Sequence, residues 1–175
     1  MNPQFTIRTT HENDMRAYRE LRLEALKNHP TAFGMDYETS AAQPESYWLE
    51  RLQANDDRAT FVAESGGQFV GMAGIFWESN VKEHHAGYIW GVYVRPAWRG
   101  AGVADSLIAA CLAWAREHEL RLVRLSVNAT NGAAIRCYLR HGFSIYGVDP
   151  EVILWDGVYY DELLMVKRLV SSRST

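Results

Sequence analysis

Two segments of the chain combine residue types that could bind a phosphate and transfer a proton. The first, residues 92–108, reads VYVRPAWRGAGVADSLI and changes after Pro96 from a strand pattern to two glycines and a helical pattern. A helix N-terminus presents unpaired N–H groups and the positive end of the helix dipole, so a turn with Gly100 and Gly102 can bind an anion. A tight strand-to-helix connection explains the same glycines, and this motif alone does not separate the two interpretations.

Two common nucleotide-binding loops do not fit this segment. A P-loop requires lysine followed by serine or threonine after its final glycine, whereas residues 103–106 read VADS. A dinucleotide fingerprint requires a third small residue at a fixed spacing, and Asp105 occupies that position. The residue sequence of the turn therefore disfavours both kinds of loop.

The second segment, residues 127–143, reads VNATNGAAIRCYLRHGF. Asn131 can cap a helix, and Ala134 and Tyr138 fall on related faces of that helix three and seven residues later. Gly142 then ends the helix before a strand. The pattern predicts a second strand-to-helix unit, about thirty residues beyond the glycine turn.

The elements that must position these segments form a mixed α and β order. A hairpin signal at residues 65–67 begins an antiparallel meander, and Gly71 and Gly74 in its second strand indicate close backbone approach or a bulge. Residues 31–42 are expected to be irregular. Strands are predicted at residues 5–9, 61–64, 69–77, 88–94, 122–127, 143–146 and 159–166, and helices from residue 15 to near His29, from Pro44 through Leu52, at 103–120 and at 131–141.

Length and composition favour one globular domain. The chain has 175 residues, 47% hydrophobic and 22% charged, which predicts a single domain over residues 1–170 and a frayed tail at residues 171–175. No apolar run approaches the roughly 18 residues needed to cross a membrane. The net charge of −3 argues against a nucleic-acid partner, which would require a clustered basic surface.

The N-terminus and the cysteines favour a reducing compartment. The first residues lack the basic and apolar regions of a secretory signal, so a cytoplasmic protein is expected. Cys111 and Cys137, the two cysteines, both fall in predicted helices and are expected to be free thiols. No cluster with metal-ligand spacing is recovered, because the adjacent His84 and His85 would point to opposite faces of a strand.

The two motifs together resemble the GCN5-related N-acetyltransferase (GNAT) superfamily. They read R-x-x-G-x-A after a V-Y-V strand, and N-x-x-A-x-x-x-Y-x-x-x-G-F further on, and they cover both halves of that family's acetyl-CoA site. The resemblance implies an α/β (α+β) fold with a mixed, mostly antiparallel twisted sheet of about seven strands and about four flanking helices. It further implies that acetyl-CoA lies in a splay between the two central strands.

The resemblance also assigns residues to the co-substrate acetyl-CoA. The pantetheine arm is expected along the backbone of Val92, Tyr93 and Val94, one of whose N–H groups would polarise the thioester. Tyr138 matches the tyrosine that protonates the departing thiolate, although it could also only pack one helix face. Asn131 and Ala134 are expected near the cofactor, and the pyrophosphate is expected on the turn formed by Arg99, Gly100, Ala101, Gly102, Val103, Ala104 and Asp105.

The general base is where the chain departs from many relatives. Alkylamines are mostly protonated at neutral pH, so a proton must be removed before attack, and many family members place a Glu or Asp on the strand before the glycine turn. Residues 87–94 read GYIWGVYV and contain no carboxylate. The candidates elsewhere, each with a solvated-surface alternative, are Glu38, Glu78, His84 and His85. Of these, Glu38 in the loop AFGMDYETS is the predicted base.

Direct transfer is favoured over a covalent intermediate. Cys137 adjoins Tyr138, but the pattern shows no neighbouring His–Asp pair, and a cysteine in such a helix is more often a small apolar group. Aromatic side chains could line an acceptor pocket or only pack the core. These are Trp48, Trp77, Trp90, Trp155, Phe33 and Tyr37.

The leading hypothesis is therefore an enzyme that moves acetyl from acetyl-CoA to a primary amine of a small molecule, peptide or protein in one ternary complex. The alternative is a catalytically idle acyl-CoA-binding or sensor domain, which the missing strand carboxylate would explain. A homodimer is common in the family. The identity of the amine stays open, because loops that contact substrate vary freely on one fold.

Overall fold

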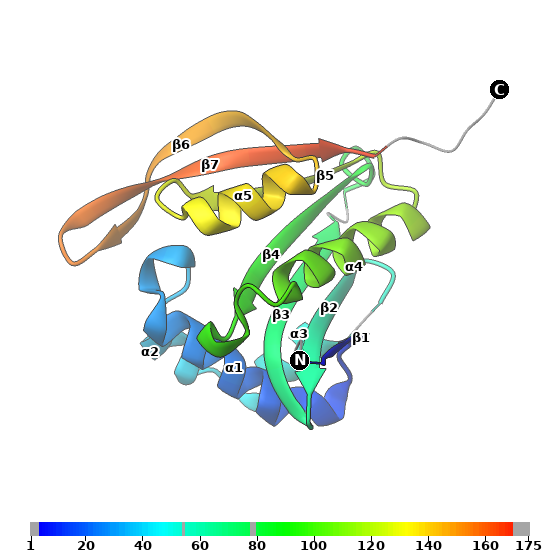
Figure 1. Ribbon diagram of the computed structural model, residues 1–175, viewed down its shortest axis with the longest axis vertical. Coiled ribbons are helices and arrows are strands. Elements are labelled where there is room, and N and C mark those ends of the chain that lie inside the picture. The colour runs from blue at the N-terminus through cyan, green and yellow to red at the C-terminus, as the bar shows by residue number, and fades with distance from the viewer. Residues whose placement is uncertain (1–3, 54, 78–79, 170–175) are drawn as a thin grey trace.

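A computed structural model describes residues 4–53, 55–77 and 80–169 of the chain. Its centre is a seven-stranded sheet in the order β1-β2-β3-β4-β5-β7-β6, antiparallel throughout except for the parallel pair β4 and β5 (Figure 1). The mixed, mostly antiparallel sheet is therefore confirmed. Its strands are β1 (Thr6–Thr9), β2 (Arg58–Ser65), β3 (Gln68–Trp77), β4 (Ala86–Val94), β5 (Leu122–Asn128), β6 (Ser144–Trp155) and β7 (Val158–Arg168).

The α-helices are α1 (Met15–Asn28), α2 (Tyr37–Ala41), α3 (Glu45–Leu52), α4 (Val103–Glu117) and α5 (Gly132–Arg140). Four of them were predicted, and α2 was not, so the expectation of an irregular segment over 31–42 was wrong in part. The Asp36 side chain accepts a hydrogen bond from Thr39 N at 2.7 Å and caps α2, and Pro30–Ala32 forms a 3₁₀ turn. Short 3₁₀ turns also occur at Glu12–Asp14 and Pro96–Trp98. None of the described helices is long and apolar enough to cross a membrane.

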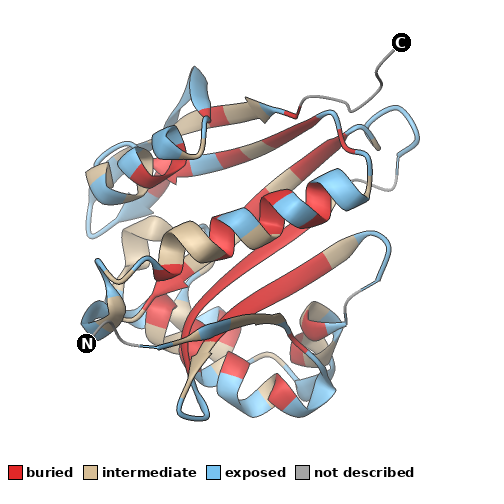
Figure 2. Ribbon diagram, turned by 45° about the vertical axis from the view of Figure 1, so that its right-hand side comes forward, coloured by how far each residue is buried: buried red, intermediate tan, exposed pale blue. Residues whose placement is uncertain are grey.

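The helices cover both faces of the sheet and bury two apolar cores (Figure 2). On one face α1 and α3 pack over side chains such as Val62 and Met72. On the other face α4 and α5 pack over the next residues along the same strands, such as Ala63 and Ala73, whose side chains point the opposite way. This alternation follows from the two-residue period of strands, and it explains why β2 and β3 read as continuous apolar runs.

The sheet opens where β4 and β5 part. The two strands pair only from Ala86↔Leu122 to Tyr88↔Arg124, after which β4 continues beside β3 and β5 continues beside β7. Beyond Tyr88, one edge of β4 therefore has no strand beside it. This opening is the splay that the family resemblance implies.

A bulge bends β4 within the splay. The register with β3 shifts between Met72 and Gly74, and Gly91 has a φ of +65°, a conformation that favours glycine. The prediction of close approach or a bulge at the β3 glycines is confirmed, because the register shift lies at Gly74 and a Cβ there would overlap the Trp90 indole. A Cβ on Gly71 would lie 2.9 Å from Val103 Cγ1 at the start of α4.

The β6–β7 hairpin is longer than predicted. The sequence prediction placed strands at 143–146 and 159–166, whereas β6 and β7 extend to a turn at Asp156 and Gly157, whose φ angles are +49° and +74°. An Asp-Gly pair is a strong signal for a two-residue hairpin turn, and it was overlooked. Many side chains of β6 are exposed, so the apolar alternation used to find strands is weak there.

Candidate active site

An anion cradle forms at the turn between β4 and α4. Gly100 and Gly102 have φ angles of +77° and +83°, and no heavy atom lies within 4 Å of a Cβ built on either. The first backbone bond of α4 runs from Ser106 N to Gly102 O at 3.0 Å, so the amides of residues 103–105 have no acceptor within the helix. Glycine is required here for its backbone conformation, and the open space beside the amides fits a phosphate group.

Arg99 folds back from this turn toward β4. Its Nε donates to the carbonyl oxygen of Val94 at 3.2 Å, and its Nη2 lies 2.8 Å from Nε2 of His29. Burial and the neighbouring guanidinium lower the pKa of His29, which favours the neutral ring that can accept this hydrogen bond. Arg99 therefore adds positive charge between the cradle and the open edge of β4.

The hydrogen-bonding alternation of β4 orients its backbone. Arg95 N donates to Val70 O at 2.9 Å, so the pair one step along the ladder, Val94 and Gly71, is of the non-bonded type. The main-chain groups of Val94 therefore point away from β3 into the splay, while those of Tyr93 point toward Met72. Val92 lies at the bulge.

Side chains also fix this part of β4 to α1. Tyr93 donates a hydrogen bond from its hydroxyl to Glu24 Oε1 at 2.9 Å, and Arg95 Nε donates to Glu24 Oε2 at 3.0 Å. Burial, followed by the contact with Glu24, raises the pKa of Tyr93. The Tyr93 phenol therefore serves to attach the strand to α1.

The second predicted motif forms α5, on the other side of the splay. Asn131 accepts a hydrogen bond from Ala134 N at 3.2 Å, so its capping role is confirmed. Tyr138 is 6% exposed and meets Phe143 edge to face, with ring centroids 6.1 Å apart. Burial raises the pKa of the Tyr138 phenol, which therefore keeps its proton throughout the neutral range.

A polar cluster joins the N-terminus of α4 to the C-terminus of α5. Asp105 accepts hydrogen bonds from Arg140 Nη2 at 3.0 Å to both oxygens, and the Cys137 thiol lies 3.8 Å from its Oδ1. His141 Nε2 lies 3.2 Å from the same oxygen. Burial opposes ionisation of Asp105, but the Arg140 hydrogen bonds outweigh it and lower the pKa. The side chain of Asp105 therefore points toward α5, whereas its backbone N–H remains available to an anion in the cradle.

This cluster corrects one step of the sequence analysis. A His–Asp pair does adjoin Cys137 in space, because the chain brings Asp105 of α4 beside His141. Asp105, Cys137 and His141 also form a set of potential metal ligands whose atoms lie within 4.8 Å of one another, where no metal site was predicted. Burial and then Asp105 raise the pKa of Cys137 to about 11, so the thiol keeps its proton, which disfavours both a nucleophile and a metal ligand.

The candidate bases are dispersed. Glu38 is exposed on α2. His84 and His85 precede β4 at the end opposite to the bulge, and the distance along the strand from Ala86 to Val92 is about 20 Å. The histidines are therefore far from Val92–Val94, and Glu78 lies outside the described residues.

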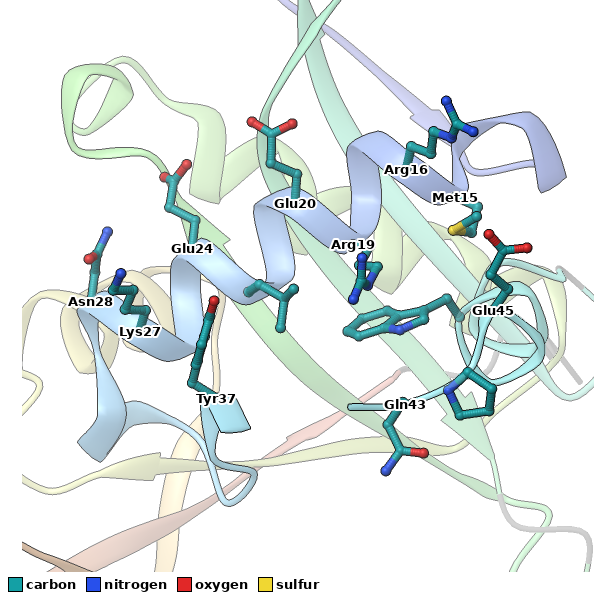
Figure 3. A pocket seen from close by; sticks show the side chains of 13 residues that line it. Met15, Arg16, Arg19, Glu20, Glu24, Lys27, Asn28, Tyr37, Gln43 and Glu45 are labelled. Carbon is teal, nitrogen blue, oxygen red and sulfur yellow. The ribbon is translucent and has the colours of Figure 1, made fainter. Parts of the chain in front are cut away.

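The predicted aromatic residues do not converge on one pocket. Trp48 and Tyr37 line a groove of about 810 Å³ on the outer face of α1, together with charged side chains of both signs (Figure 3). Trp77 stacks on His84, and Trp155 is exposed on β6. Trp90 and Phe33, in contrast, both lie over the guanidinium of one residue, Arg22.

Sequence reasoning overlooked Arg22. This residue of α1 is buried among the apolar residues of the helix face that packs on the sheet. The signal was available, because Arg22 follows Tyr18 by four residues and precedes Leu26 by four, and so interrupts the apolar stripe of an amphipathic helix. An arginine at such a position requires an explanation.

Together the splay, the free edge of β4 and the cradle define an α/β protein that holds an extended, phosphate-bearing ligand between two strands. The family model for the Acetyltransferase (GNAT) family matches residues 17–143. The chain belongs to this family and is an acetyl-CoA-dependent N-acetyltransferase.

Relatives and solved structures agree with this membership. An uncharacterized N-acetyltransferase of Methanocaldococcus jannaschii is 29% identical, over 94% of this chain and 67% of its own length. The L-amino acid N-acetyltransferase AaaT of Escherichia coli is 30% identical, over 72% of this chain and 86% of its own length. A mycothiol acetyltransferase of Streptomyces bingchenggensis is also 30% identical, but the chain spans only 44% of its length.

Two solved structures share the fold over nearly their whole length. A ribosomal-protein-alanine N-acetyltransferase from Brucella melitensis has a TM-score of 0.79 at 28% identity, covering 94% of this chain and 99% of that one. The acetyltransferase YncA from Salmonella typhimurium, solved with acetyl-CoA, has a TM-score of 0.79 at 22% identity and covers 98% of both chains.

Proposed function

We propose that this enzyme transfers acetyl from acetyl-CoA to a primary amine by direct attack within one ternary complex. The observation that carries the proposal is the continuity of the open β4 edge, the glycine turn and the α4 N-terminus, which suits one extended acyl-CoA. In the reaction the amine nitrogen forms a bond to the acetyl carbon, the carbon–sulfur bond breaks, the amine loses a proton and the thiolate gains one.

The binding residues follow from this placement. The pyrophosphate lies on the amides of the Arg99–Asp105 turn, where the α4 dipole contributes about 0.3 to 1 kcal/mol. The pantetheine arm runs along Val92–Val94 as an added strand, and the outward main-chain groups of Val94 are its main partners. Asn131 and Ala134 border the cofactor from the first turn of α5.

Tyr138 is the proposed general acid. Its raised pKa keeps the phenol protonated until the thiolate departs, and its burial supports transfer within a water-poor site. Cys137 does not form an acetyl intermediate, because its thiol is protonated and hydrogen-bonded to Asp105. Glu38 stays the predicted base, and from its exposed position on α2 it would act through water.

We also propose a cytoplasmic homodimer that forms through the β6–β7 hairpin. Pairing of β5 with β7 ends at Asn128↔Glu162, so residues 150–161 extend past β5 as two strands. Two-stranded hairpins are marginally stable by themselves, yet this one exposes large apolar side chains. A second copy of the chain would cover them in a self-complementary contact. The exposed side chains are Val152, Leu154, Trp155, Val158 and Tyr159.

The acceptor needs a direct test. The related enzymes carry different names, L-amino acid N-acetyltransferase for AaaT and mycothiol acetyltransferase for others. The experiment is a screen of thiol release from acetyl-CoA against amino acids, polyamines, simple amines and peptides, with calorimetric binding of acetyl-CoA in parallel. Release with at least one amine, and intersecting initial-rate lines, would support direct transfer. Tight binding without release would instead support the sensor alternative, and parallel lines would indicate a covalent intermediate.

A further inference from the structure

A buried guanidinium lies without a hydrogen-bond partner beside the bulge of β4. Arg22 is 8% exposed, and within the described part of the chain its Nη1 has no partner. This nitrogen lies 3.5 Å from the position that a Cβ on Gly91 would occupy. A full charge has thus been removed from water and placed against the strand on which the acyl group is proposed to lie.

The surroundings attract a cation but leave its N–H groups free. The Arg22 guanidinium carbon lies 4.5 Å from the centroid of the Phe33 ring and 5.9 Å from that of Trp90. Aromatic faces stabilise the charge, yet they do not replace hydrogen-bond acceptors in the plane of the guanidinium. Arg51 of α3 lies 5.1 Å over the same Trp90 ring. We call Arg22, Arg51, Phe33 and Trp90 the Arg22 cluster.

No carboxylate neutralises this cluster among the residues that the structure describes. The titratable groups that influence Arg22 are the like-charged Arg51 and the phenols of Tyr18 and Tyr47, none of which is a carboxylate. The acidic side chains of α1, Glu20 and Glu24, line the groove on the opposite face of the helix (Figure 3). The Arg22 cluster is therefore a region of positive charge beside the reaction centre.

Stability does not explain an arginine at this position. An unpaired buried charge costs free energy, and buried charged groups are often replaced by apolar residues of similar volume without loss. An anion delivered by a ligand would satisfy the guanidinium. Phe33, Trp90 and Gly91 are only half-buried, so the cluster is open to a small molecule.

We propose that Arg22 binds the carboxylate of the acceptor, and that the acceptors are free α-amino acids. This inference rests on the proposed function, because it requires the thioester to lie at Val92–Val94. Arg22 adjoins Gly91, one residue before that stretch. Only a short distance would therefore separate a carboxylate bound to Arg22 from the thioester. An α-amino group, on the carbon that bears the carboxylate, meets this constraint. A polyamine or a peptide N-terminus lacks the adjacent carboxylate.

Matched acceptors test the proposal. L-phenylalanine is compared with phenethylamine, and L-leucine with 3-methylbutylamine, by thiol release from acetyl-CoA. A charged hydrogen-bonding pair is worth roughly 10- to 100-fold in affinity, and kcat/KM should favour the amino acids by about that factor. Equal or better use of the amines would overturn the proposal while leaving acetyl transfer itself established.

Variants separate ligand binding from a structural role. Arg22→Met should raise the KM for L-phenylalanine roughly 10- to 100-fold, leave the KM for acetyl-CoA and the use of phenethylamine unchanged, and leave Tm equal or higher. Arg22→Lys should recover part of the loss, and Arg16→Met, on the exposed face of α1, is the control. A lower Tm with equal losses on both acceptors would show that Arg22 is only structural.

If no acceptor causes thiol release from acetyl-CoA, equilibrium binding still tests whether Arg22 binds a carboxylate. L-phenylalanine and phenethylamine would be titrated by calorimetry into the protein saturated with CoA. Tighter binding of the amino acid that is lost in Arg22→Met would support the Arg22 assignment although the proposed function had failed. Equal binding of the two ligands would overturn it.

Discussion

The proposed acid role of Tyr138 depends on how burial affects its phenol. Its ring lies in the core between α5 and the sheet, and desolvation disfavours the phenolate. In the proposed role the phenol keeps its proton until the thiolate forms beside it, in water-poor surroundings that also raise the basicity of that thiolate. The core contacts and the acid role are compatible, because the first use the ring and the second uses the hydroxyl.

Tyr138→Phe should lower kcat with little change in the Kd for acetyl-CoA, because the hydroxyl is needed mainly in the transition state. A general acid is commonly worth 10²- to 10⁴-fold, so a loss of that order is expected. Steady-state kinetics and calorimetry provide the two readouts. Since burial raises the pKa of Tyr138, the alkaline loss of wild-type activity that this phenol causes should lie above its ordinary pKa of 10.0. Unchanged turnover would remove Tyr138 from the acid role.

At the scale of elements, the cradle depends on the backbone of one turn. The positive φ of Gly102 directs the chain from β4 into α4 and leaves the first amides of the helix exposed. Any side chain at residue 102 would be strained by the left-handed backbone conformation. A negatively charged side chain would in addition repel a bound phosphate. These two effects can be separated with isosteric substitutions.

Gly102→Glu should bind CoA more weakly than Gly102→Gln. Both variants carry the same strain, about 1 to 2 kcal/mol, and similar bulk. The additional carboxylate at a helix N-terminus should cost about 0.3 to 1 kcal/mol more in binding, or up to about fivefold in Kd. Calorimetric titration with CoA measures the difference. Equal Kd values for the two variants would show that the phosphates lie elsewhere.

The first strand is held to the sheet by a compact ionic network. Arg8 donates to Asp14 through Nη1 at 2.7 Å and Nη2 at 2.9 Å, and its Nε donates to Glu64 on β2 at 2.7 Å. Burial alone would raise the pKa of Asp14, but the hydrogen bonds from Arg8 and His11 reverse this and lower it below its ordinary value of 3.8. The network thus joins β1, the 3₁₀ turn that precedes α1, and β2.

Asp14→Asn should lower the free energy of unfolding by about 1 to 3 kcal/mol at neutral pH. Because the folded-state pKa of Asp14 is lowered, the wild-type advantage is present above pH 3.8 and declines as the pH falls through the folded-state pKa. Urea unfolding of both proteins between pH 7 and about pH 2 tests this. Glu12→Gln, in the same turn but exposed, is the control and should change little. An advantage that stayed constant down to acid pH would contradict the assignment.

At the scale of the whole molecule, the β6–β7 hairpin carries most of the exposed large apolar side chains among the described residues. Leu154 and Tyr159 pair across its strands and are 57% and 58% exposed. The hairpin is the far edge of the sheet from β1 and projects beyond β5 and α5 (Figure 1). A contact between two copies there would bury these exposed apolar side chains.

Sedimentation velocity should show the wild-type chain as a dimer and Leu154→Glu as a monomer, because burying an unpaired carboxylate opposes association. Val81→Glu changes a residue that is 84% exposed outside the hairpin, and it should leave the dimer intact. A monomeric wild type, or a dimer that tolerates Leu154→Glu, would place the interface elsewhere or exclude it.

Local signals in the sequence were sufficient for the two motifs that define the family. Gly100, Gly102 and the Asn131 cap are short-range features, because backbone conformation and capping depend on residues within one turn of each other. The strands β2 to β5 were also predictable, since buried strands concentrate apolar residues. The helix α2 and the long hairpin were missed because a cap and a two-residue turn, rather than apolar periodicity, mark them.

The sequence by itself determined the class of fold, the glycine turn between β4 and α4, and the helix that carries Tyr138. Only the tertiary structure placed Asp105 beside Cys137 and His141, and Arg22 against the bulge at Gly91. These contacts join residues far apart in the chain, and their geometry depends on how the strands splay and the helices pack. The glycine turn and the α5 cap are local in sequence and could therefore be predicted, whereas the Arg22 cluster is assembled from separate elements.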